Sequence, residues 1–405
     1  MSNDEFRRSN GLGGETPVGQ IIQNSTLEIR QSGLSAISHL EVRRFRNISH
    51  LNLAPHPQFN FFYGDNAQGK TSILEGIYFL SELRSFRSQE LESLLHHGEA
   101  EGRLEAQVAE AGLFHDIRIR LGTQGKTVQL NGKAVRPFRR LRKILPMVLF
   151  VPDSVRLFRA SPSERRTYFD GFFGLLSDPF AAQTAEYARA LRQKQALIEP
   201  GGGAAPWAFE AWEEKLAELG AAITRERMLR TRDLEGHFRD CFRELSDGAW
   251  ETELRYRPHL SSLVEEDPSS FPFLLKAEME RRRDEELRRG QVLVGPHRDD
   301  WVLTLGERRL KEEGSQGQHR IAVAALKLAV IHLLREKGLN PLALFDDLLS
   351  ELDATRSLKV LKFLSDCRCQ VFLTSVAPEG ISFQNLPGRI YRVQGGKILE
   401  NPREI

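Results

Sequence analysis

The chain has 405 residues, which exceeds one ordinary single-core domain, so we expect two lobes. Its formal net charge is only +2, so any contact with nucleic acid has to come from a local basic patch. Three cysteines (Cys241, Cys367 and Cys369), with no further Cys or His pair at zinc spacing, argue against a disulfide framework and a zinc site. We therefore expect reduced thiols and a cytoplasmic protein.

Two features bear on targeting. Residues 1–33 are rich in Ser, Asn, Gly and Gln without a period, and they are interpreted as a disordered extension or a misassigned start. They lack the apolar segment of a signal peptide. The longest apolar stretch, Ile321–Leu334, is interrupted by Lys327 and His332 and is too short to span a bilayer. No membrane contact is expected.

The first third of the chain predicts mainly strands. Short apolar or alternating segments indicate strands at Ala36–Val42, Ile48–Leu53, Phe59–Tyr63, Arg103–Ala109, Leu113–Leu121, Thr127–Val135 and Pro146–Val151. Apolar residues at helical spacing predict a helix over Lys70–Leu83. Asn131-Gly132 supplies a left-handed turn that closes the last antiparallel pair.

The pattern changes at Pro152. From there to about Gly290 the chain reads as mostly helical, with a loop at Gly201–Pro206 and an uninterrupted helix from Pro206 to Ser246. An apolar stripe on that helix (Trp212, Leu216, Leu219 and Ile223) is typical of a helix-packing seam. Strand and turn signals return at Gln291–Leu305, followed by a helix at Gln318–Arg335, a strand at Leu342–Phe345 and a final αβ segment. A helical lobe (152–290) thus interrupts a split α/β lobe (34–151 and 291–405).

The clearest motif is a phosphate loop. Gly64–Thr71 has the pattern G-x-x-x-x-G-K-T, placed after an apolar strand and at the start of an amphipathic helix. Its glycines let backbone N–H groups approach phosphates, and the helix N-terminus adds positive potential. The predicted nucleotide-binding residues here are Gly64, Asp65, Asn66, Ala67, Gln68, Gly69, Lys70, Thr71 and Ser72. Lys70 is expected to reach the β- and γ-phosphates of ATP, and Thr71 to ligate Mg²⁺.

A pair of carboxylates follows the strand Leu342–Phe345. Asp346 is expected to hold the metal and its water, and Asp347 to orient or deprotonate the attacking water. Alone, such a run is also what a strand and a helix cap would give. Together with the phosphate loop it predicts a nucleotide hydrolysis site.

A third motif, Ser315-Gln-Gly-Gln318, stands at the start of a predicted helix between the other two motifs. Its hydroxyl and N–H groups suit an anion, and as an isolated string it would be a polar helix cap. The order of the three motifs resembles that of ABC-type ATPases. That resemblance implies that Ser315, Gly317 and Gln318 cap the γ-phosphate held by a partner subunit, so that ATP joins a head-to-tail homodimer.

Further segments extend this resemblance. Ser350–Asp353 resembles the D-loop, and Thr374 or Ser375 stands where ABC proteins usually carry a switch His. Phe45-Arg46-Asn47 resembles an element of SMC-like heads whose Arg lies near the nucleotide. Arg46 and Thr374 are therefore added to the predicted nucleotide-binding residues.

From about Leu34 to its C-terminus the chain resembles the RecF family of bacterial recombination mediators. The similarity also covers Phe150–Val155, Arg165-Arg166 with Asp170, and Gly295–Asp300, while Ala67 replaces a usual Gly. It implies an ABC-type P-loop ATPase head, with a mixed sheet and an antiparallel β subdomain, interrupted by a mostly helical arm. It also implies ATP-dependent dimerisation on DNA, slow hydrolysis, and help in loading recombinase at single-stranded gaps during repair and replication restart, with RecR and RecO as partners.

Two basic clusters are candidates for DNA phosphate contacts. They are Arg136, Arg139, Arg140, Arg142 and Lys143, and Arg281, Arg282, Arg283, Arg288 and Arg289. A solvated surface is the alternative for both, especially the second, which alternates with acidic residues. The Gly295–Asp300 segment is either a docking loop or a structural one. Its His297-Arg298-Asp299 does not continue as a kinase loop, because Thr304 stands where Asn is required.

Three other functions fit less well. The long segment between Thr71 and Ser315 argues against a transporter subunit. The helical lobe is too short, and too broken by glycine, for a long SMC-like coiled coil. No acidic nuclease domain follows the ATPase motifs, which argues against an ATPase–nuclease.

Overall fold

The computed structural model describes residues 35–110, 112–136, 139–198, 206–376, 386–399 and 403–404. They form two compact units, each assembled from separated stretches of chain. The first contains the described residues within Met1–Met147, Asn340–Asp346 and Arg368–Ile405, and the second contains those within Val148–Leu339 and Asp347–Cys367. The predicted extension at residues 1–33 lies outside the described residues, as do residues 201–205 of the predicted loop.

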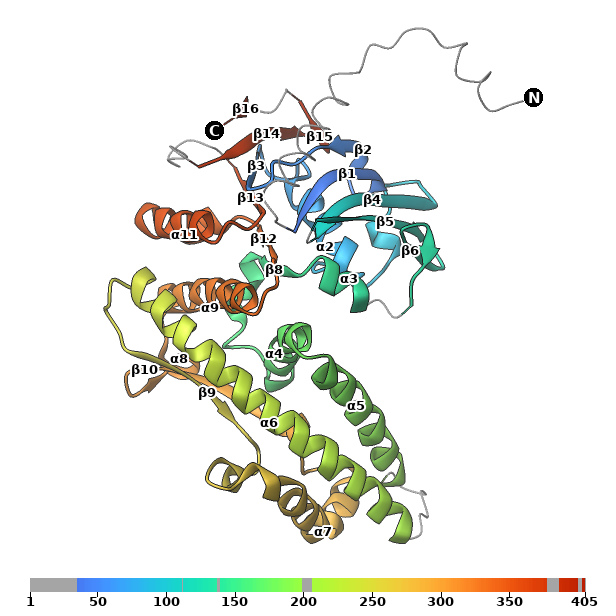
Figure 1. Ribbon diagram of the computed structural model, residues 1–405, viewed down its shortest axis with the longest axis vertical. Coiled ribbons are helices and arrows are strands. Elements are labelled where there is room, and N and C mark those ends of the chain that lie inside the picture. Colours follow the sequence, from blue (N-terminus) through green and yellow to red (C-terminus); the bar gives the residue numbers. More distant parts are fainter. Residues whose placement is uncertain are drawn as a thin grey trace, which may run out of the picture. The chain divides into compact units, whose positions relative to one another are not determined.

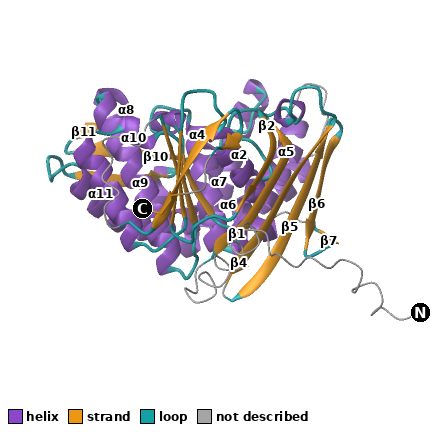
Figure 2. Ribbon diagram, turned by 90° about the horizontal axis from the view of Figure 1, so that it is seen from above, coloured by secondary structure: helices purple, strands orange, loops and turns teal. Residues whose placement is uncertain are grey.

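An antiparallel sheet occupies the N-terminal part of the first unit (Figures 1 and 2), with strand order β2-β1-β4-β5-β6-β7. Its strands are β1 (Ala36–Phe45), β2 (Ile48–Leu53), β4 (Glu101–Glu110), β5 (Leu113–Gly122), β6 (Gly125–Leu130) and β7 (Lys133–Ala134). On β5 the buried side chains of Ile117, Ile119 and Leu121 alternate with more exposed polar ones, as expected for a sheet with one buried face. Asn131 and Gly132 have φ of 52° and 76°, which confirms the predicted turn.

A second sheet of this unit is mainly parallel, in the order β15-β14-β3-β13-β12. Its strands are β3 (Phe59–Tyr63), β12 (Leu342–Phe345), β13 (Val371–Ser375), β14 (Gly388–Gln394) and the short β15 (Lys397–Ile398), and β16 (Arg403–Glu404) also pairs with β14. The apolar runs of β3, β12 and β13 are almost wholly buried, as in sheets covered on both faces. Because parallel strands end at one edge, three site segments (Gly64–Gly69, Asp346 and Thr374) meet there.

Helix α2 (Lys70–Glu82) contacts strands of both sheets, namely β1 and β4 on one side and β13 on the other. It is therefore buried around most of its circumference, including Ile73, Leu74, Ile77 and Leu80. The remaining short elements of this unit are η2 (Glu92–Leu94) and α3 (Arg139–Ile144), and β8 (Met147–Phe150) leads into the second unit.

The second unit is mostly helical and is organised around α6 (Pro206–Leu245), whose 40 residues span about 60 Å at 1.5 Å per residue. Helices α5, α7 and α9 pack along it. Leu216, Leu219 and Ile223 of the predicted stripe are buried, which confirms a packing seam. The other helices are α4 (Pro162–Leu176), α5 (Asp178–Ile198), α7 (Phe271–Arg289), α8 (Leu310–Glu313), α9 (Gln316–Glu336), α10 (Leu348–Glu351) and α11 (Ala354–Asp366), with short turns η3 (Pro152–Arg156), η4 (Ser261–Val264), η5 (Pro268–Ser270) and η6 (Pro296–Arg298).

A small antiparallel sheet in the second unit was not fully anticipated. It runs in the order β11-β10-β9, with β9 at Thr252–Arg257, β10 at Asp300–Leu305 and β11 at Arg308–Arg309. β9 falls inside the segment predicted to be helical. Its alternation of Thr252, Leu254 and Tyr256 with charged residues was missed there, and it pairs with a strand far along the chain. The compact second unit also continues to Leu339, since α9 packs on α6. The lobe boundary predicted near residue 291 stays a prediction.

Among the described residues no helix is both long and apolar enough to cross a membrane.

Candidate nucleotide-binding site

The phosphate loop connects the end of β3 to the start of α2. Gly64 and Gly69 have φ of 149° and 108°, which strongly favour glycine. A Cβ at Gly64 would overlap the carbonyl oxygen of Val393, and one at Gly69 would lie 3.1 Å from Asn47 and from the Cα of Gly396. Both glycines are thus required by backbone conformation and by close neighbours. Along the turn Asp65, Asn66 and Ala67 are exposed, Gln68 is half-buried, and Ser72 is buried in the first turn of α2.

Ala67 adopts a backbone conformation that an alanine side chain disfavours. The residue would be unstrained if this position were right-handed, but its φ is +62°, in the left-handed region. An L-residue there costs roughly 1–2 kcal/mol relative to the right-handed conformation. The loop therefore carries local strain at a site where glycine would have none.

We expect Ala67→Gly to raise the free energy of unfolding by about 1 kcal/mol, because glycine reaches positive φ without a steric penalty. Chemical denaturation of the two proteins measures the difference. Ala185→Gly, at an exposed position inside α5, is the matched control and should lower stability by about 1 kcal/mol. A loss of stability at both positions would contradict the left-handed assignment.

Lys70 lies at the first position of α2 and is buried. Its Nζ donates to the carbonyl oxygens of Gly64 (2.5 Å) and Asp65 (2.8 Å). The ammonium group therefore sits within the turn formed by the loop. This is where a lysine has to lie to neutralise phosphates bound by the N–H groups of the loop.

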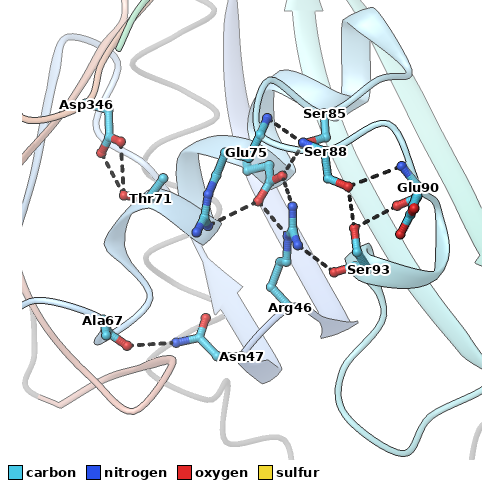
Figure 3. A network of polar contacts seen from close by, with 11 residues as sticks. Arg46, Asn47, Ala67, Thr71, Glu75, Ser85, Ser88, Glu90, Ser93 and Asp346 are labelled. Carbon is cyan, nitrogen blue, oxygen red and sulfur yellow. Dashed lines mark hydrogen bonds and ion pairs between the residues drawn. The ribbon is translucent and has the colours of Figure 1, made fainter. Parts of the chain in front are cut away.

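Three side chains from the ends of three elements meet beside Lys70. The Oγ1 of Thr71 donates to the carboxylate of Asp346, at 3.0 Å from each oxygen (Figure 3). The Oγ1 of Thr374, at the end of β13, donates to the same carboxylate at 2.7 Å. Asp346 is only 8% exposed. The structure thus brings together three predicted residues from distant parts of the sequence.

These groups suit Mg²⁺. A hydroxyl and a carboxylate are hard oxygen donors, and Mg²⁺ is usually held by one or two such protein groups together with phosphate oxygens and water. Thr71 and Asp346 are the residues that would hold it. Thr374 would help to orient the carboxylate through its own hydrogen bond to it.

Asp347 follows directly and adopts a left-handed conformation (φ 52°) as the N-cap of α10. Its carbonyl oxygen accepts from the backbone N–H of Ser350 at 3.3 Å and from the Ser350 hydroxyl at 2.8 Å. The chain therefore turns sharply between the two carboxylates. A positive φ at a non-glycine residue is a local cost that often accompanies functional positions.

The turn at Ser315 begins α9 in the second unit. The Oγ of Ser315 accepts from the N–H of Gln318 (3.2 Å), and the side-chain oxygen of Gln318 accepts from the N–H of Ser315 (2.8 Å). Ser315 and Gly317 are exposed. This capping box holds the start of a 21-residue helix at an exposed surface, where its N–H groups and dipole favour an anion.

Two residues that the sequence did not indicate hold this turn from the side. Arg159 donates from Nε to Nε2 of His319 and from Nη2 to the carbonyl oxygen of Gly314, both at 3.0 Å. Burial and the adjacent Arg159 charge lower the pKa of His319 to about 4. His319 is thus a neutral acceptor near pH 7, and Arg159 can be regarded as a positioning residue for the turn.

Arg46 is engaged away from the loop. Its guanidinium donates to both oxygens of the buried Glu75 on α2 (2.9 and 2.6 Å) and to the carbonyl oxygen of Ser93 (2.6 Å). The neighbouring Asn47 instead donates from Nδ2 to the carbonyl oxygen of Ala67 at 3.3 Å (Figure 3). Contact between Arg46 and a nucleotide would require it to leave Glu75, so this role stays a prediction.

The hairpin between β14 and β15 also supports the loop and was missed from sequence. Gly395 and Gly396 have φ of 55° and 74° and form its turn. The N–H of Gly395 donates to the side-chain oxygen of Gln68 (2.7 Å), and the N–H of Gly396 to the Gln68 carbonyl (2.8 Å). A Gly-Gly pair between two short strands signals such a hairpin, but nothing local shows which loop it contacts.

The Gly295–Asp300 segment has a structural role within the second unit. Asp299 is buried and accepts from Nη1 of Arg227 (3.1 Å) and from the N–H of His259 (2.6 Å). Burial raises the pKa of Asp299, and Arg227 opposes that shift. Asp300 forms a bidentate pair with Arg165, both contacts at 2.7 Å. The segment is therefore joined to α4 and α6 through ion pairs, and to His259, just after β9, through a hydrogen bond.

The two basic clusters differ. In the second cluster, on α7, most of the arginines form ion pairs. Arg281 and Arg282 pair with Glu278, Arg289 with Glu285, and Arg283 with the buried Glu213, which favours the alternative without DNA contact, a solvated surface. In the first, Arg142 pairs with Glu82 at 2.7 Å, whereas Arg136 and Arg140 are exposed. The first cluster is the better candidate for phosphate contacts.

A family model matches almost the whole described chain. Residues 36–398 match the RecF/RecN/SMC N-terminal domain. The DNA replication and repair protein RecF of Geotalea uraniireducens is 32% identical over 357 residues, covering 88% of this chain and 97% of that protein. RecF of Syntrophotalea carbinolica is 34% identical over 371 residues, covering 90% and 99%.

Solved structures give the same result. The recombination mediator protein RecF-ATPrS of the RecFOR pathway aligns with a TM-score of 0.81 and 26% identity, over 90% of this chain and 98% of that one. The corresponding RecF-ATP structure aligns with a TM-score of 0.80 and 26% identity, over 92% and 99%. An Smc head domain from Pyrococcus furiosus, at 16% identity and a TM-score of 0.55, shares the fold.

Proposed function

The chain belongs to the RecF proteins of the RecF/RecN/SMC family, and from this premise we propose that it is an ATP-gated recombination mediator. In this proposal it dimerises on DNA with ATP, hydrolyses ATP slowly, and helps to load recombinase at single-stranded gaps. ATP is the nucleotide of the related solved structure, and Mg²⁺ is its proposed companion.

One observation carries the proposal: Lys70, Thr71, Asp346 and Thr374 converge at the phosphate loop. Lys70 would neutralise the β- and γ-phosphates, and Thr71 and Asp346 would hold the metal. Mg²⁺ would supply charge neutralisation at the phosphates. Thr374 keeps the carboxylate oriented, and we assign it the place of the usual switch His.

Lys70→Ala should abolish the response to ATP, because no other side chain places a cation inside the Gly64–Asp65 turn in the described part of the chain. Equilibrium binding of a fluorescent ATP analogue and ATP-dependent sedimentation measure the effect. Lys70→Arg should also bind weakly, since a planar guanidinium does not replace a compact ammonium. Lys133→Ala, an exposed position in β7, is the control and should bind normally. Wild-type binding by Lys70→Ala would refute the assignment.

Hydrolysis in the proposed dimer combines residues of two subunits. Asp347 of one subunit orients or deprotonates the attacking water, and Ser315 of the other, with Gly317 and Gln318, caps the γ-phosphate. The capping box and Arg159 hold Ser315 in place for this role. Because each site needs both subunits, turnover depends on dimerisation and ATP acts as a switch.

DNA is the proposed macromolecular ligand, with RecR and RecO as partner proteins. The first basic cluster, on and just before α3, would contact DNA phosphates, so the affinity for DNA should fall steeply with salt and depend little on base sequence. Arg139→Glu combined with Arg140→Glu should lower affinity and reduce the slope of log K against log salt by about two.

Fluorescence anisotropy at several salt concentrations measures both quantities. Arg281→Glu combined with Arg289→Glu makes the same charge change on the ion-paired face of α7 and should leave the slope unchanged. If the salt dependence of DNA binding becomes weaker in the Arg281→Glu, Arg289→Glu variant and is unchanged in the Arg139→Glu, Arg140→Glu variant, the DNA site lies on α7.

A further inference from the structure

The second unit contains a cavity of about 340 Å³ between η3, α4 and α9. Its lining includes Asp153, Arg156, Glu164, Tyr168 and Lys327. None of these residues takes part in the nucleotide chemistry proposed above. The cavity is as large as the smaller pockets that hold small molecules in proteins.

Lys327 is the unusual member of this lining. It is the lysine that interrupts the apolar stretch of α9, and it is only 6% exposed. Its Nζ lies 4.2 Å from the centre of the Tyr168 ring, and it has no hydrogen bond or ion pair with any residue that the structure describes. Within the part of the chain that the structure describes, the interaction partner of this amine is thus the aromatic ring of Tyr168.

The neighbouring charges are already occupied or exposed. Glu164 belongs to the capping box of α4 and accepts from the hydroxyl and the N–H of Ser161 (2.7 and 2.9 Å). Asp153 and Arg156 lie on η3, are 87% and 81% exposed, and face each other at 3.9 Å. Tyr168 remains beside the amine, and burial raises the pKa of its hydroxyl.

A buried lysine without an anionic partner is unfavourable when charged. Burial accordingly lowers the pKa of Lys327 to about 7. The amine is then divided between its neutral and charged forms near neutral pH. An anion that entered the cavity would stabilise the charged form.

We propose that this cavity is a binding site for a single carboxylate group, which pairs with the ammonium of Lys327 above the Tyr168 ring. A carboxylate carries one negative charge, matching the one buried cation. A phosphate dianion would bring a second negative charge close to Glu164 and Asp153. The carboxylate belongs either to a small acid or to an acidic side chain of another protein.

Calorimetric titration of the full chain tests the site with acetate, L-glutamate and a short peptide containing one Glu, at constant ionic strength. Only the charged form of Lys327 pairs with the probe, and the carboxylates stay ionised between pH 6 and 8. With a pKa of about 7, the charged fraction falls about tenfold from pH 6 to pH 8, so affinity should fall about tenfold as well. Binding near pH 7 should take up protons.

Lys327→Met should abolish this binding, because Met fills similar space without the charge. Lys337→Met, after the C-terminal end of α9 and exposed, is the matched control and should bind as wild type. Binding by acetate and glutamate alone identifies a small acid as ligand, and binding by the peptide alone identifies an acidic protein segment. If no probe binds, if affinity is the same at both pH values, or if a folded Lys327→Met binds equally well, the proposal is wrong.

Discussion

Ser315→Arg is expected to bind ATP with nearly wild-type affinity and to remain monomeric when ATP is added. The phosphate loop and Asp346 belong to the first compact unit, whereas Ser315 is the exposed N-cap of α9 in the second. In the proposed dimer Ser315 approaches the γ-phosphate held by the partner, so a bulky cation there prevents closure. Sedimentation with and without ATP should show loss of the dimer, and ATPase activity should fall to background.

Replacing Ser315 also removes a helix cap, which by itself costs about 1 kcal/mol. Ser161→Arg controls for that loss, because Ser161 caps α4 through the same capping box, with Glu164 in place of Gln318. This control should lose similar stability and still dimerise. Dimerisation of Ser315→Arg at the wild-type level would exclude the shared-site mechanism.

Mixing two inactive variants tests the same mechanism independently. A heterodimer of Ser315→Arg and Lys70→Ala has one composite site with both lesions and one with neither. The intact site should restore ATPase activity to part of the wild-type level. If each site instead used Lys70 and Ser315 of one subunit, every site would carry a lesion and no activity would return.

Asp347→Asn is expected to hydrolyse ATP about 10²–10⁴-fold more slowly while binding it normally, since it removes a basic or water-orienting group. Asn suits the test because, like Asp, it tolerates the left-handed conformation (φ 52°) of this position. The ATP-bound dimer should therefore become long-lived.

Single-turnover kinetics measure the hydrolysis step, and sedimentation measures the lifetime of the dimer. Asp366→Asn makes the same charge change at the exposed end of α11 and should keep wild-type turnover. Unchanged hydrolysis in Asp347→Asn would place the catalytic base on another residue.

Much of the first unit could be predicted because local and global signals agree. The bounds of β2, β3 and β12 match the predicted strands, and α2 ends within one residue of the predicted helix. In the second unit, α9 also lies within two residues of its predicted helix. In these segments the local sequence, namely continuous or alternating apolar residues and a glycine-rich turn, is enough to indicate the secondary structure. The contact of Thr71 with Asp346 then follows, because parallel strands bring their carboxyl ends to one edge.

The rest depends on contacts between distant residues. β9 carries a short strand signal, the alternation of Thr252, Leu254 and Tyr256 with charged residues, but it lies in a mostly helical segment and its pairing partner β10 is far along the chain. The contact of Arg159 with the Ser315 turn could not be predicted, because nothing in the sequence around a single arginine indicates which distant residue it contacts. The left-handed φ of Ala67 is likewise imposed by its surroundings, since alanine itself disfavours that conformation.

The hairpin at Gly395-Gly396 has a consequence for the order of events during synthesis. Gln68 is held by backbone groups made more than 320 residues after it, and Gly64 lies against Val393. A nascent chain that ends before β14 therefore lacks the residues that contact its phosphate loop from this side. This holds even though every residue of the G-x-x-x-x-G-K-T motif has already left the ribosome. Contacts between residues so far apart in the sequence form slowly and late in folding. The surroundings of the phosphate loop are therefore complete only once the chain has been made as far as Gly396.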